Sequence, residues 1–432
     1  MNTADSAHVA VIGGGYAGMA AAVSLARHGV RVTVYEAGKT LGGRARQVSH
    51  ASCDTPLDNG QHLLLGAYRT TLELARLVDP NTPKWLRLPL QLHAEAGLKL
   101  RAPKLPAPWN MLTALLGARG ISYRHRLTAL HFLMRLRLRD YRLTQDLPLG
   151  ELLSTQPREL IELLWEPLCL AALNTPPATA SAQVFLNVLR DSLGRSRADS
   201  DLILPTVDLS AFFPDAAAAY LRNRGGELIL QNRIRHIARI GTKFVIDEQT
   251  HSHIVCAVAP QQTGELLLPF AELAETRTQI SRLRYQPITT VYLQYPPEVR
   301  LPRAMTGLTH ALSQWVFDRG ISHRQHGLLA VVISARDAVQ HSGRQALITD
   351  IAKELELHLG TPSQPLWHQI IVEKRATFSC EAGIQRPAQD TPLTNFYLAG
   401  DYTLGDYPAT LEAATQSGVK CATMILTGLT QL

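Results

Sequence analysis

The sequence predicts an α/β fold in which a nucleotide-binding domain, built on a parallel sheet with helices, is interrupted by a mixed α+β substrate domain. Three observations support this prediction. Residues 8–36 have the pattern of a strand, a tight glycine turn, a helix and a second strand. Strand-like and helix-like segments of similar character return in residues 204–265 and 376–432. A chain of 432 residues is also long for a single hydrophobic core, so two domains are expected.

The turn of the N-terminal unit carries a glycine pattern. An apolar run over residues 9–12 ends at Gly13, and Gly15 and Gly18 complete the spacing G-x-G-x-x-G ahead of a helix-like stretch over 20–28. The first glycine permits the sharp turn, the second lets the backbone approach a pyrophosphate, and the third lets helix and strand pack closely. The pattern therefore predicts a Rossmann-like dinucleotide site.

The start of this helix and the second strand complete the predicted site. Tyr16 and Ala17 open the helix, whose N-terminal N–H groups and dipole favour a phosphate. A second apolar run over residues 30–35 ends at Glu36, followed by Ala37. An acid in this place accepts hydrogen bonds from a ribose diol. The alternative, a glycine-rich turn without a ligand, is disfavoured by the two strands and the acid together.

Three separated segments are expected to form the nucleotide-binding domain, and two intervening segments the substrate domain. The former are residues 1–85, 204–265 and 376–432, and the latter are 86–203 and 266–375. The second nucleotide-binding segment predicts a helix over residues 215–224 and short β-like runs over 227–230, 233–240, 243–246 and 253–258. The domain is expected to include a small antiparallel β element beside its parallel sheet. The third predicts a strand and a helix, over 395–398 and 410–426. Residues 86–203 read as mostly helical, whereas the segment from 266 mixes strands with a helix, over 289–295, 328–333 and 344–359.

A second glycine cluster, LGGRAR, occupies residues 41–46. Its glycines, including Gly43, let the backbone bend close to a ligand, and Arg44 is a permanent cation that suits a pyrophosphate. Ala45 continues the cluster. Taken alone, the cluster is more simply a surface turn with a solvated arginine. Directly after a dinucleotide unit, it predicts a phosphate contact.

A third cluster lies near the C-terminus. The predicted strand runs into Gly400 and Asp401, whose carboxylate could meet a ribityl hydroxyl. Pro408 suits the first position of the following helix, and Ala409 and Thr410 extend its first turn. The N–H groups there could face the electron-rich edge of a flavin. A plain strand–turn–helix connection is the alternative.

These clusters together carry a family resemblance. The combination of V-I-G-G-G-x-A-G, Glu36, L-G-G-R and, far downstream, L-A-G-D resembles the FAD-dependent amine oxidase and phytoene desaturase superfamily. The resemblance implies FAD as the cofactor, with L-G-G-R beside the pyrophosphate and G-D near the ribityl chain. It also implies that Gly60, Gln61 and His62 run close to the flavin ring and that Ile234 contacts the cofactor.

Three further stretches narrow the resemblance. Residues 58–68 (DNGQHLLLGAY), 165–177 (WEPLCLAALNTPP) and 400–413 look like the hydroxysqualene dehydroxylases, the squalene-associated desaturases of bacterial hopanoid clusters. This family implies reductive removal of an allylic hydroxyl from hydroxysqualene to give squalene, with hydride from N5 of reduced FAD. An acid must help water leave, and an apolar pocket must hold the long isoprenoid.

Two other readings stay open at this point. One is an oxidative isoprenoid desaturase or amine oxidase of the same superfamily. The other, of a different class, is a non-enzymatic carrier of prenyl lipids on this fold, like the Rab escort and GDP-dissociation-inhibitor proteins. The intact glycines, Glu36, Arg44 and Asp401 argue against a carrier. No second G-x-G-x-x-G unit is evident, so the electron donor is undetermined.

Three residues are candidates for the acid. His62 titrates near the required range, although a histidine that only bonds backbone groups is equally consistent. Asp58 in D-N-G-Q-H is the second candidate, and its alternative role is to cap a turn. Glu166 lies in an apolar stretch where burial would keep a carboxyl protonated, although a structural hydrogen bond explains it as well.

The positive charge of the chain is concentrated in residues 101–142. This segment holds nine Lys and Arg side chains against one acid, and so accounts for the whole net charge of +7. If residues 124–142 form one helix, Arg124, Arg135, Arg139 and Arg142 share one face. With apolar residues upstream, this predicts a candidate surface for an anionic membrane, the alternative being a solvated cap helix. Nucleic-acid binding is not supported, because the segment shows no regular interleaving of aromatic with basic residues.

Composition excludes several other classes. The N-terminus lacks a secretory signal pattern, and no apolar run is long enough for a membrane span, so we expect a cytoplasmic protein, peripheral on the inner face of the membrane at most. The five cysteines are far apart without a C-x-x-C pair, which predicts neither a metal site nor disulfides.

Overall fold

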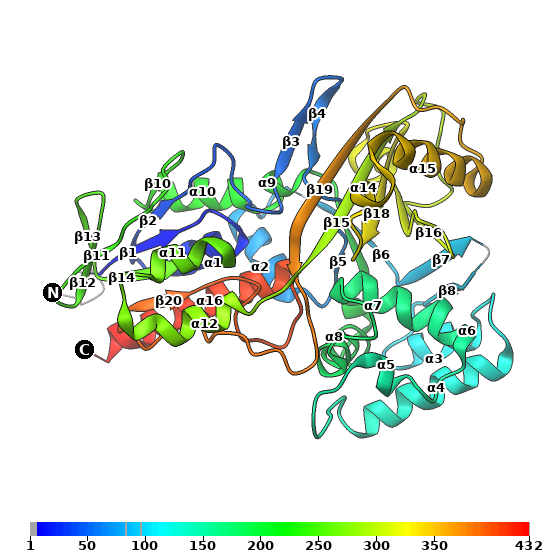
Figure 1. Ribbon diagram of the computed structural model, residues 1–432, viewed down its shortest axis with the longest axis horizontal. Coiled ribbons are helices and arrows are strands. Elements are labelled where there is room, and N and C mark those ends of the chain that lie inside the picture. The colour runs from blue at the N-terminus through cyan, green and yellow to red at the C-terminus, as the bar shows by residue number, and fades with distance from the viewer. Residues whose placement is uncertain (1–6, 83, 96, 432) are drawn as a thin grey trace.

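A five-stranded parallel sheet forms one half of the computed structural model, which describes residues 7–82, 84–95 and 97–431 (Figure 1). In spatial order its strands are β10 (Glu227–Ile229), β2 (Arg31–Tyr35), β1 (His8–Ile12), β14 (His253–Cys256) and β20 (Phe396–Leu398). Every neighbouring pair is parallel, as expected for apolar strands that are buried on both faces. The strands come from the three segments predicted for the nucleotide-binding domain.

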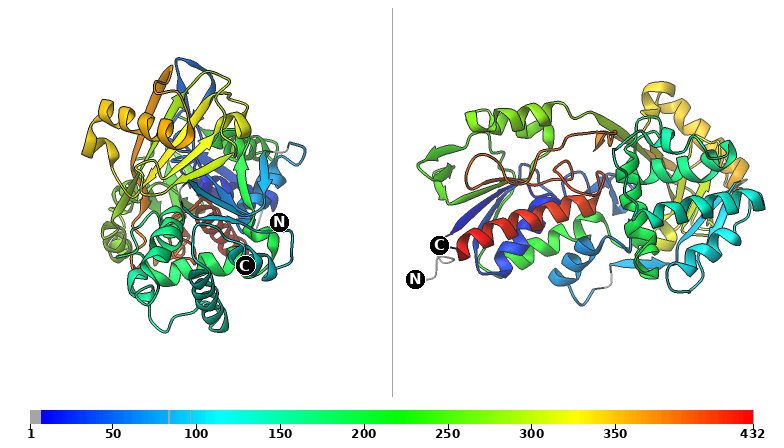
Figure 2. Two further views of the ribbon diagram at one scale, coloured as in Figure 1. Left: turned by 90° about the vertical axis from the view of Figure 1, so that its right-hand side faces the viewer. Right: turned by 90° about the horizontal axis from the view of Figure 1, so that it is seen from below.

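Helices close one face of this sheet (Figure 2). They are α1 (Tyr16–Arg27), α2 (Arg69–Val78), α9 (Leu209–Phe212), α10 (Pro214–Arg222) and α16 (Leu411–Thr430). The central helix, α1, is rich in alanine and almost wholly buried, so neighbouring helices can approach it closely. Gly418 of α16 makes the closest approach, because a Cβ there would lie 2.0 Å from the Ala17 carbonyl oxygen.

The half that contains the parallel sheet also contains a small antiparallel sheet and two further helices. The sheet consists of β11 (Ala238–Ile240), β12 (Lys243–Ile246) and β13 (Gln249–His251), and the helices are α11 (Pro260–Leu267) and α12 (Ala274–Ser281). Phe244 of β12 contacts Phe270 between the helices, with ring centroids 6.2 Å apart. The antiparallel element was predicted, but the strand expected over 233–240 is confined to β11.

A seven-stranded mixed sheet forms the other half. Its strands, in order, are β19 (Trp367–Phe378), β15 (Tyr285–Gln294), β18 (Leu328–Ser334), β17 (Trp315–Asp318), β16 (Met305–Leu308), β7 (Gln91–Glu95) and β8 (Lys99–Arg101). The helix α15 (Arg344–Leu359) packs its apolar side on one face of this sheet. The long strands β15 and β19 run between the two halves of the molecule (Figure 1).

Helices cover the opposite face of this sheet. They are α3 (Trp109–Leu116), α4 (Tyr123–Leu138), α5 (Leu149–Leu152), α6 (Arg158–Leu160), a π-helical turn (Ile161–Trp165), α7 (Glu166–Leu173) and α8 (Ala182–Leu193). The remaining elements are short. They are β3 (Gln47–His50), β4 (Cys53–Asp58), β5 (Leu64–Leu65), β6 (Trp85–Leu88), β9 (Leu202–Pro205), α13 (Arg319–His323), α14 (Ala338–Ser342) and two 3₁₀ turns (Arg197–Ser200 and Ala271–Leu273).

The structure corrects two details of the predicted organisation. Residues 86–101, expected to be mostly helical, lie largely in β6, β7 and β8. β6 pairs with β9 and β7 with β16, both from distant parts of the chain, whereas β8 pairs with the neighbouring β7. The four predicted domain boundaries fall inside β6, β9, α11 and β19 rather than in linkers. The chain therefore passes between the two halves through continuous elements.

The helix in the basic segment ends earlier than the predicted range of 124–142. Because α4 ends at Leu138, Arg139 and Arg142 lie beyond it and do not extend the face of Arg124 and Arg135. Arg126 is used internally, since its Nη1 donates to the Leu116 carbonyl oxygen at 2.8 Å. Across the described ranges, no helix combines the length and the apolar character needed to cross a bilayer.

Candidate active site

One cavity of about 1110 Å³ joins the two halves of the molecule. It begins at the β1–α1 turn, passes the 41–46 cluster, and ends between the seven-stranded sheet and helices α3, α4, α7 and α8. Its volume exceeds the range of about 300–1,000 Å³ usual for small-ligand pockets. A cavity of this size has room for an extended cofactor and a second ligand together.

The β1–α1 turn is shaped as its glycines predict. Gly13 has a φ of +110°, and a Cβ there would lie 2.7 Å from the Ala257 carbonyl oxygen. Gly13, Gly15, Tyr16 and Ala17 line the cavity. No side chain of the described residues caps the N-terminus of α1, so its N–H groups are available to a ligand. Gly18 stays outside the lining and serves packing, since a Cβ there would lie 2.0 Å from the Gly13 carbonyl oxygen.

Glu36 shapes the loops at this end of the cavity. Its carboxylate accepts hydrogen bonds from the backbone N–H groups of Gly14 at 2.7 Å and Gly38 at 2.6 Å. A carboxylate has about four acceptor positions, so it can also accept from a ribose. Ala37 and the buried Ile234 line the same end. The segment around Ile234 lacks regular structure and follows the cavity wall, which explains why the strand predicted there is cut short.

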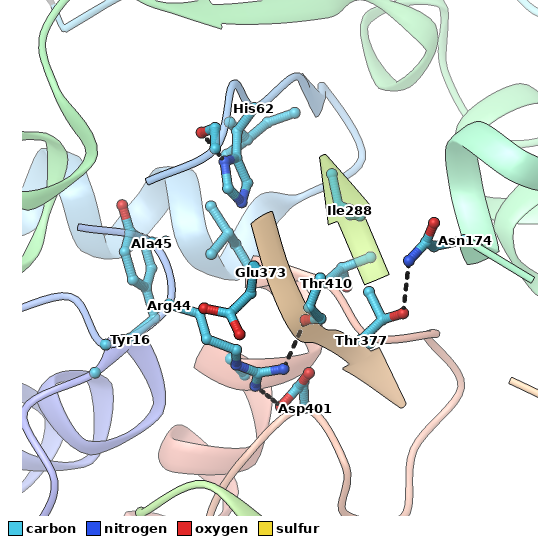
Figure 3. Close-up of a pocket in the computed structure, with 18 of the residues that line it drawn as sticks. Tyr16, Arg44, Ala45, His62, Asn174, Ile288, Glu373, Thr377, Asp401 and Thr410 are labelled. Atoms are coloured by element: carbon cyan, nitrogen blue, oxygen red, sulfur yellow. Dashed lines mark hydrogen bonds and ion pairs between the residues drawn. The ribbon is translucent and has the colours of Figure 1, made fainter. Parts of the chain in front are cut away.

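The 41–46 cluster and the C-terminal cluster meet in an ion pair between Arg44 and Asp401 (Figure 3). Arg44 also donates to the Ala376 carbonyl oxygen at 2.8 Å. Burial disfavours the charged guanidinium, but the charge and hydrogen bond of Asp401 outweigh burial and raise the pKa of Arg44. Gly43, Ala45 and Gly400 line the cavity beside this pair. Arg44 and Asp401, each predicted to contact the cofactor, therefore lie side by side, although 357 positions separate them in sequence.

The loop of Gly60, Gln61 and His62 lines the centre of the cavity. Nδ1 of His62 lies 2.7 Å from the Gly60 carbonyl oxygen, which only accepts, so Nδ1 carries the proton. Burial lowers the pKa of His62, against the opposing effect of that hydrogen bond. The ring is thus neutral, with an unprotonated Nε2. In this tautomer Nε2 of His62 faces the cavity as a hydrogen-bond acceptor, and a role for His62 in proton transfer stays a prediction.

Asp58 holds this loop from behind and does not line the cavity. Its Oδ2 lies 3.1 Å from Nη1 of the fully buried Arg319, and its Oδ1 accepts from the Leu209 N–H at 2.8 Å. The same Nη1 donates to Gln61 Oε1 at 2.8 Å. Burial raises the pKa of Asp58, while Arg319 and the Leu209 N–H oppose the rise. Asp58 therefore positions the loop, and the prediction that it acts as the acid is not supported by its placement.

Glu166 is likewise outside the cavity lining. It opens α7 and is partly exposed, so the expected burial of its carboxyl does not occur. The neighbouring Trp165 does line the cavity, and its indole N–H is buried without a partner among the described residues. Thr290 on β15 also lines the cavity, and its Oγ1 is likewise buried without a partner among the described residues. Two polar atoms of this kind are free to bind a ligand.

The far end of the cavity is apolar on two sides. Its roof comes from the helices, through Met111, Leu115, Leu133, Leu164, Leu168, Leu170, Phe185, Val188 and Leu189. Its floor comes from alternate residues of the seven-stranded sheet, through the apolar Ile288, Met305, Trp315, Phe317 and Val332, with Thr290, Ser334 and Glu373 as its polar members. Sequence analysis missed the floor, because alternate positions of five strands meet only once the sheet forms.

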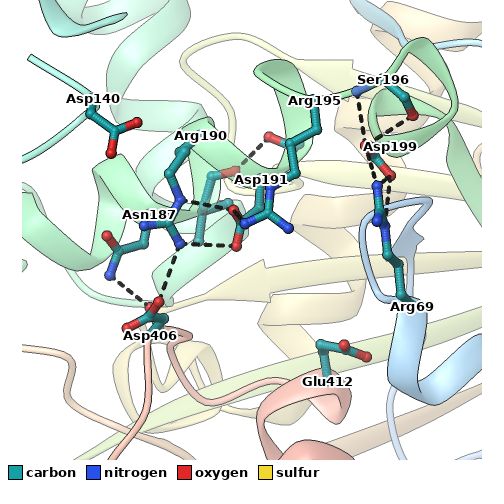
Figure 4. Close-up of polar contacts among 12 residues, drawn as sticks. Arg69, Asp140, Asn187, Arg190, Asp191, Arg195, Ser196, Asp199, Asp406 and Glu412 are labelled. Atoms are coloured by element: carbon teal, nitrogen blue, oxygen red, sulfur yellow. Dashed lines mark hydrogen bonds and ion pairs between the residues drawn. The ribbon is translucent and has the colours of Figure 1, made fainter.

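The segment before α16 is tied to α8 by polar contacts (Figure 4). Arg190 pairs with Asp191 at 2.9 Å and with Asp406 at 3.2 Å, and Asn187 donates to the Asp406 carbonyl oxygen at 3.1 Å. These contacts fix the approach to Ala409 and Thr410, which line the cavity. Thr410 caps α16 by accepting from the Ala413 N–H at 3.1 Å. The helix begins at Leu411, so Pro408 lies before it and outside the lining, contrary to prediction.

Comparison with known proteins identifies the family of this site. The family model described as flavin containing amine oxidoreductase matches residues 16–426. The chain belongs to this family. Together with the dinucleotide end of the cavity, membership of this family makes FAD the cofactor, as the sequence predicted.

Relatives and structures agree with this assignment. The chain is 30% identical to a hydroxysqualene dehydroxylase of Rhodopseudomonas palustris, over 97% of this chain and 98% of the relative. It is 27% identical to one of Zymomonas mobilis over 96% of this chain and 98% of the relative, and 23% identical to a zeta-carotene desaturase of Synechocystis over 98% of both. Cyclohexylamine oxidase of Brevibacterium oxydans shares the fold, with a TM-score of 0.70 and 17% identity over 98% of this chain and 99% of that one.

The cavity of this family member fits an extended FAD on the evidence of its own residues. The open N-terminus of α1 and the glycine-shaped turn suit the pyrophosphate, and Glu36 suits the adenosine ribose. Arg44 and Asp401 would lie alongside the pyrophosphate and ribityl chain, and the Gly60–His62 loop and Thr410 would lie near the ring. These residue roles stay predictions.

Proposed function

We propose that this protein is an FAD-dependent oxidoreductase that removes the hydroxyl group of hydroxysqualene reductively to give squalene. The observation that carries the proposal is the apolar end of the cavity, which continues directly from the dinucleotide end. Relatives of matching length that are named hydroxysqualene dehydroxylase support the same substrate. Reduced FAD, when bound, supplies the hydride in this reaction.

The chain's own residues account for binding and for the exclusion of water. The roof and floor remove a long hydrocarbon from water, and each buried methylene contributes about 0.8 kcal/mol. The same surfaces keep water from a carbon that becomes cationic when its hydroxyl departs. Trp165 and Thr290 provide unpartnered polar atoms, within the part of the chain that the structure describes, that can orient that hydroxyl.

An anaerobic single-turnover experiment tests this function. We expect enzyme reduced with dithionite to form squalene when hydroxysqualene is added, with return of the oxidised flavin absorbance in equal amount. Squalene added in place of hydroxysqualene is the control and should leave the flavin reduced. Absence of both squalene and flavin oxidation would contradict the proposal.

The similarity to zeta-carotene desaturase supports a second candidate, an oxidative isoprenoid desaturase. Oxidised enzyme mixed anaerobically with zeta-carotene distinguishes the two. Bleaching of the flavin would favour the desaturase, whereas an unchanged spectrum is expected for the reductive enzyme. A purified protein without flavin absorbance, even after incubation with FAD, would instead favour a lipid carrier.

The surface of α3 and α4 suits attachment to an anionic membrane. Trp109 and Leu138 are 57% and 86% exposed, and exposed arginines lie among them. The same two helices contribute Met111, Leu115 and Leu133 to the cavity roof. A lipid substrate could therefore enter from the surface to which these helices attach.

Charge reversal on this surface should weaken membrane binding. The double variant R135E/R139E should bind vesicles of phosphatidylserine and phosphatidylcholine at least about thirtyfold more weakly, because each basic residue lost from such a surface removes about 1 kcal/mol and each glutamate adds repulsion. Sedimentation with the vesicles measures this. The matched control R27E/R222E changes two exposed arginines on the other half and should bind as wild type does. Equal binding of both double variants would contradict attachment through α3 and α4.

A further inference from the structure

The position of the acid follows from the carboxyl groups in the cavity. Within the described parts of the chain, four carboxyl side chains line it: Glu36, Glu265, Glu373 and Asp401. Glu36 bonds two backbone N–H groups at the adenosine end, and Asp401 pairs with Arg44. Glu265 is on α11, which begins just after Ala257. Ala257 lies against Gly13, so Glu265 belongs to the dinucleotide end of the cavity. Glu373 is the one that remains, and it lies on β19 where the neighbourhood of Arg44 meets the floor of the substrate end.

Strand register places Glu373 within this floor. On β19 it lies opposite Ile288 of β15, which in turn lies opposite Ser334 of β18. Directly opposed residues of antiparallel strands project from the same face, with Cβ atoms about 4.5–5.5 Å apart. Thr290, two residues beyond Ile288, projects from that face as well. The carboxyl of Glu373 thus shares a surface with the unpartnered Thr290 hydroxyl.

The contacts of Glu373 leave its oxygens largely uncommitted (Figure 3). Oε2 accepts from Asn59 Nδ2 at 3.4 Å, and Oε1 accepts from the Arg375 N–H at 3.3 Å, and both bonds are long. Asn59 Nδ2 also donates to the Arg44 carbonyl oxygen at 3.2 Å, which ties Glu373 to the loop of His62. Among the residues that the structure describes, Glu373 forms no salt bridge, although its charge is near enough to Arg44 to contribute to the raised pKa of that guanidinium.

We propose that Glu373 is the catalytic acid that protonates the departing hydroxyl of the substrate. This inference rests on the proposed function. The C–O bond breaks with both electrons remaining on oxygen, which takes the proton of Glu373 and leaves as water. The carbon then accepts a hydride from the reduced flavin, and the Glu373 carboxylate regains a proton from solvent. In the interval, the carboxylate faces the allylic cation and stabilises it.

The variant E373Q tests the role, since glutamine keeps the size of the side chain but has no acidic proton. Squalene formation in a single turnover should slow by about 10²–10⁴-fold, the usual contribution of a general acid. FAD content, the spectrum of the oxidised flavin, and its perturbation on titration with hydroxysqualene should match wild type. The control E356Q, on the exposed side of α15, should react at the wild-type rate. E373D keeps an acidic proton and should be faster than E373Q.

An altered leaving group separates proton donation from other roles. Chloride leaves without a proton, so the allylic chloride analogue of the substrate should react equally fast in E373Q and wild type, each corrected for a blank without enzyme. The inference would be overturned if E373Q reacted slowly with both substrates. It would also be overturned if E373Q converted hydroxysqualene at the wild-type rate. Wild-type enzyme that does not convert hydroxysqualene would overturn the proposed function itself.

Discussion

Replacement of Arg319 by methionine should lower the free energy of unfolding by about 3–5 kcal/mol, the usual loss when one partner of a buried ion pair is removed. Arg319 is fully buried, and its Nη1 contacts both Asp58 and Gln61. In R319M the Asp58 carboxylate keeps the N–H of Leu209 but loses its counter-charge. The Gly60–His62 loop loses a tether as well, so FAD affinity should fall. Chemical denaturation and FAD titration measure the two effects.

The loss of stability in R319M should depend on pH. Burial already raises the pKa of Asp58, and removal of the opposing Arg319 charge raises it further above the unfolded value. Folded R319M therefore binds more protons than unfolded R319M between those two pKa values, and its stability falls as pH rises through this range. The difference in the free energy of unfolding between R319M and wild type should therefore be smaller at low pH.

Two variants check the origin of this effect. D58N/R319M removes both charges and should recover part of the loss, since a neutral amide is less costly to bury. R158M breaks an exposed pair with Glu162 and should leave stability unchanged. If D58N/R319M is no more stable than R319M, the loss does not come from an unpaired Asp58.

Replacement of Gly18 by alanine should reduce both stability and FAD binding. A Cβ at Gly18 would lie 2.0 Å from the Gly13 carbonyl oxygen, and no rotamer change can relieve a contact with backbone. Overpacking of this kind costs about 1–3 kcal/mol. The Gly13 turn must move, and the turn lies where the pyrophosphate is expected, so FAD affinity should fall about tenfold or more. Thermal unfolding and FAD titration provide the measurements.

The control for this change is G428A. Gly428 is an exposed residue of α16, and a Cβ added there would meet no atom of the described residues within 4 Å. Alanine favours a helix over glycine by about 1 kcal/mol, so this variant should be at least as stable as wild type. Wild-type FAD affinity in G18A would show that the turn is not part of the cofactor site.

Local patterns in the sequence predicted the nucleotide-binding half well. The strand–turn–helix–strand unit over residues 8–36 depends on contacts between near neighbours and on glycine's access to positive φ, both of which are encoded locally. In the second and third segments, α10, α16 and the strands β10, β12, β14 and β20 were located within a few residues, whereas β9, α9, β13 and α11 were not predicted. The strands β6 and β7 were missed because each is held by a remote partner, β9 and β16, and β8 was missed with them because it pairs with β7.

The sequence by itself determined the cofactor class, because glycine spacing and the acid at Glu36 are the local requirements of a dinucleotide. Tertiary structure decided which side chains line the cavity. It brought Arg44 to Asp401, withdrew Asp58 behind the loop through Arg319, and turned Glu373 toward the cavity. Spacing along the chain carries no information on such contacts, because strand register and burial select them only after the two halves have packed together.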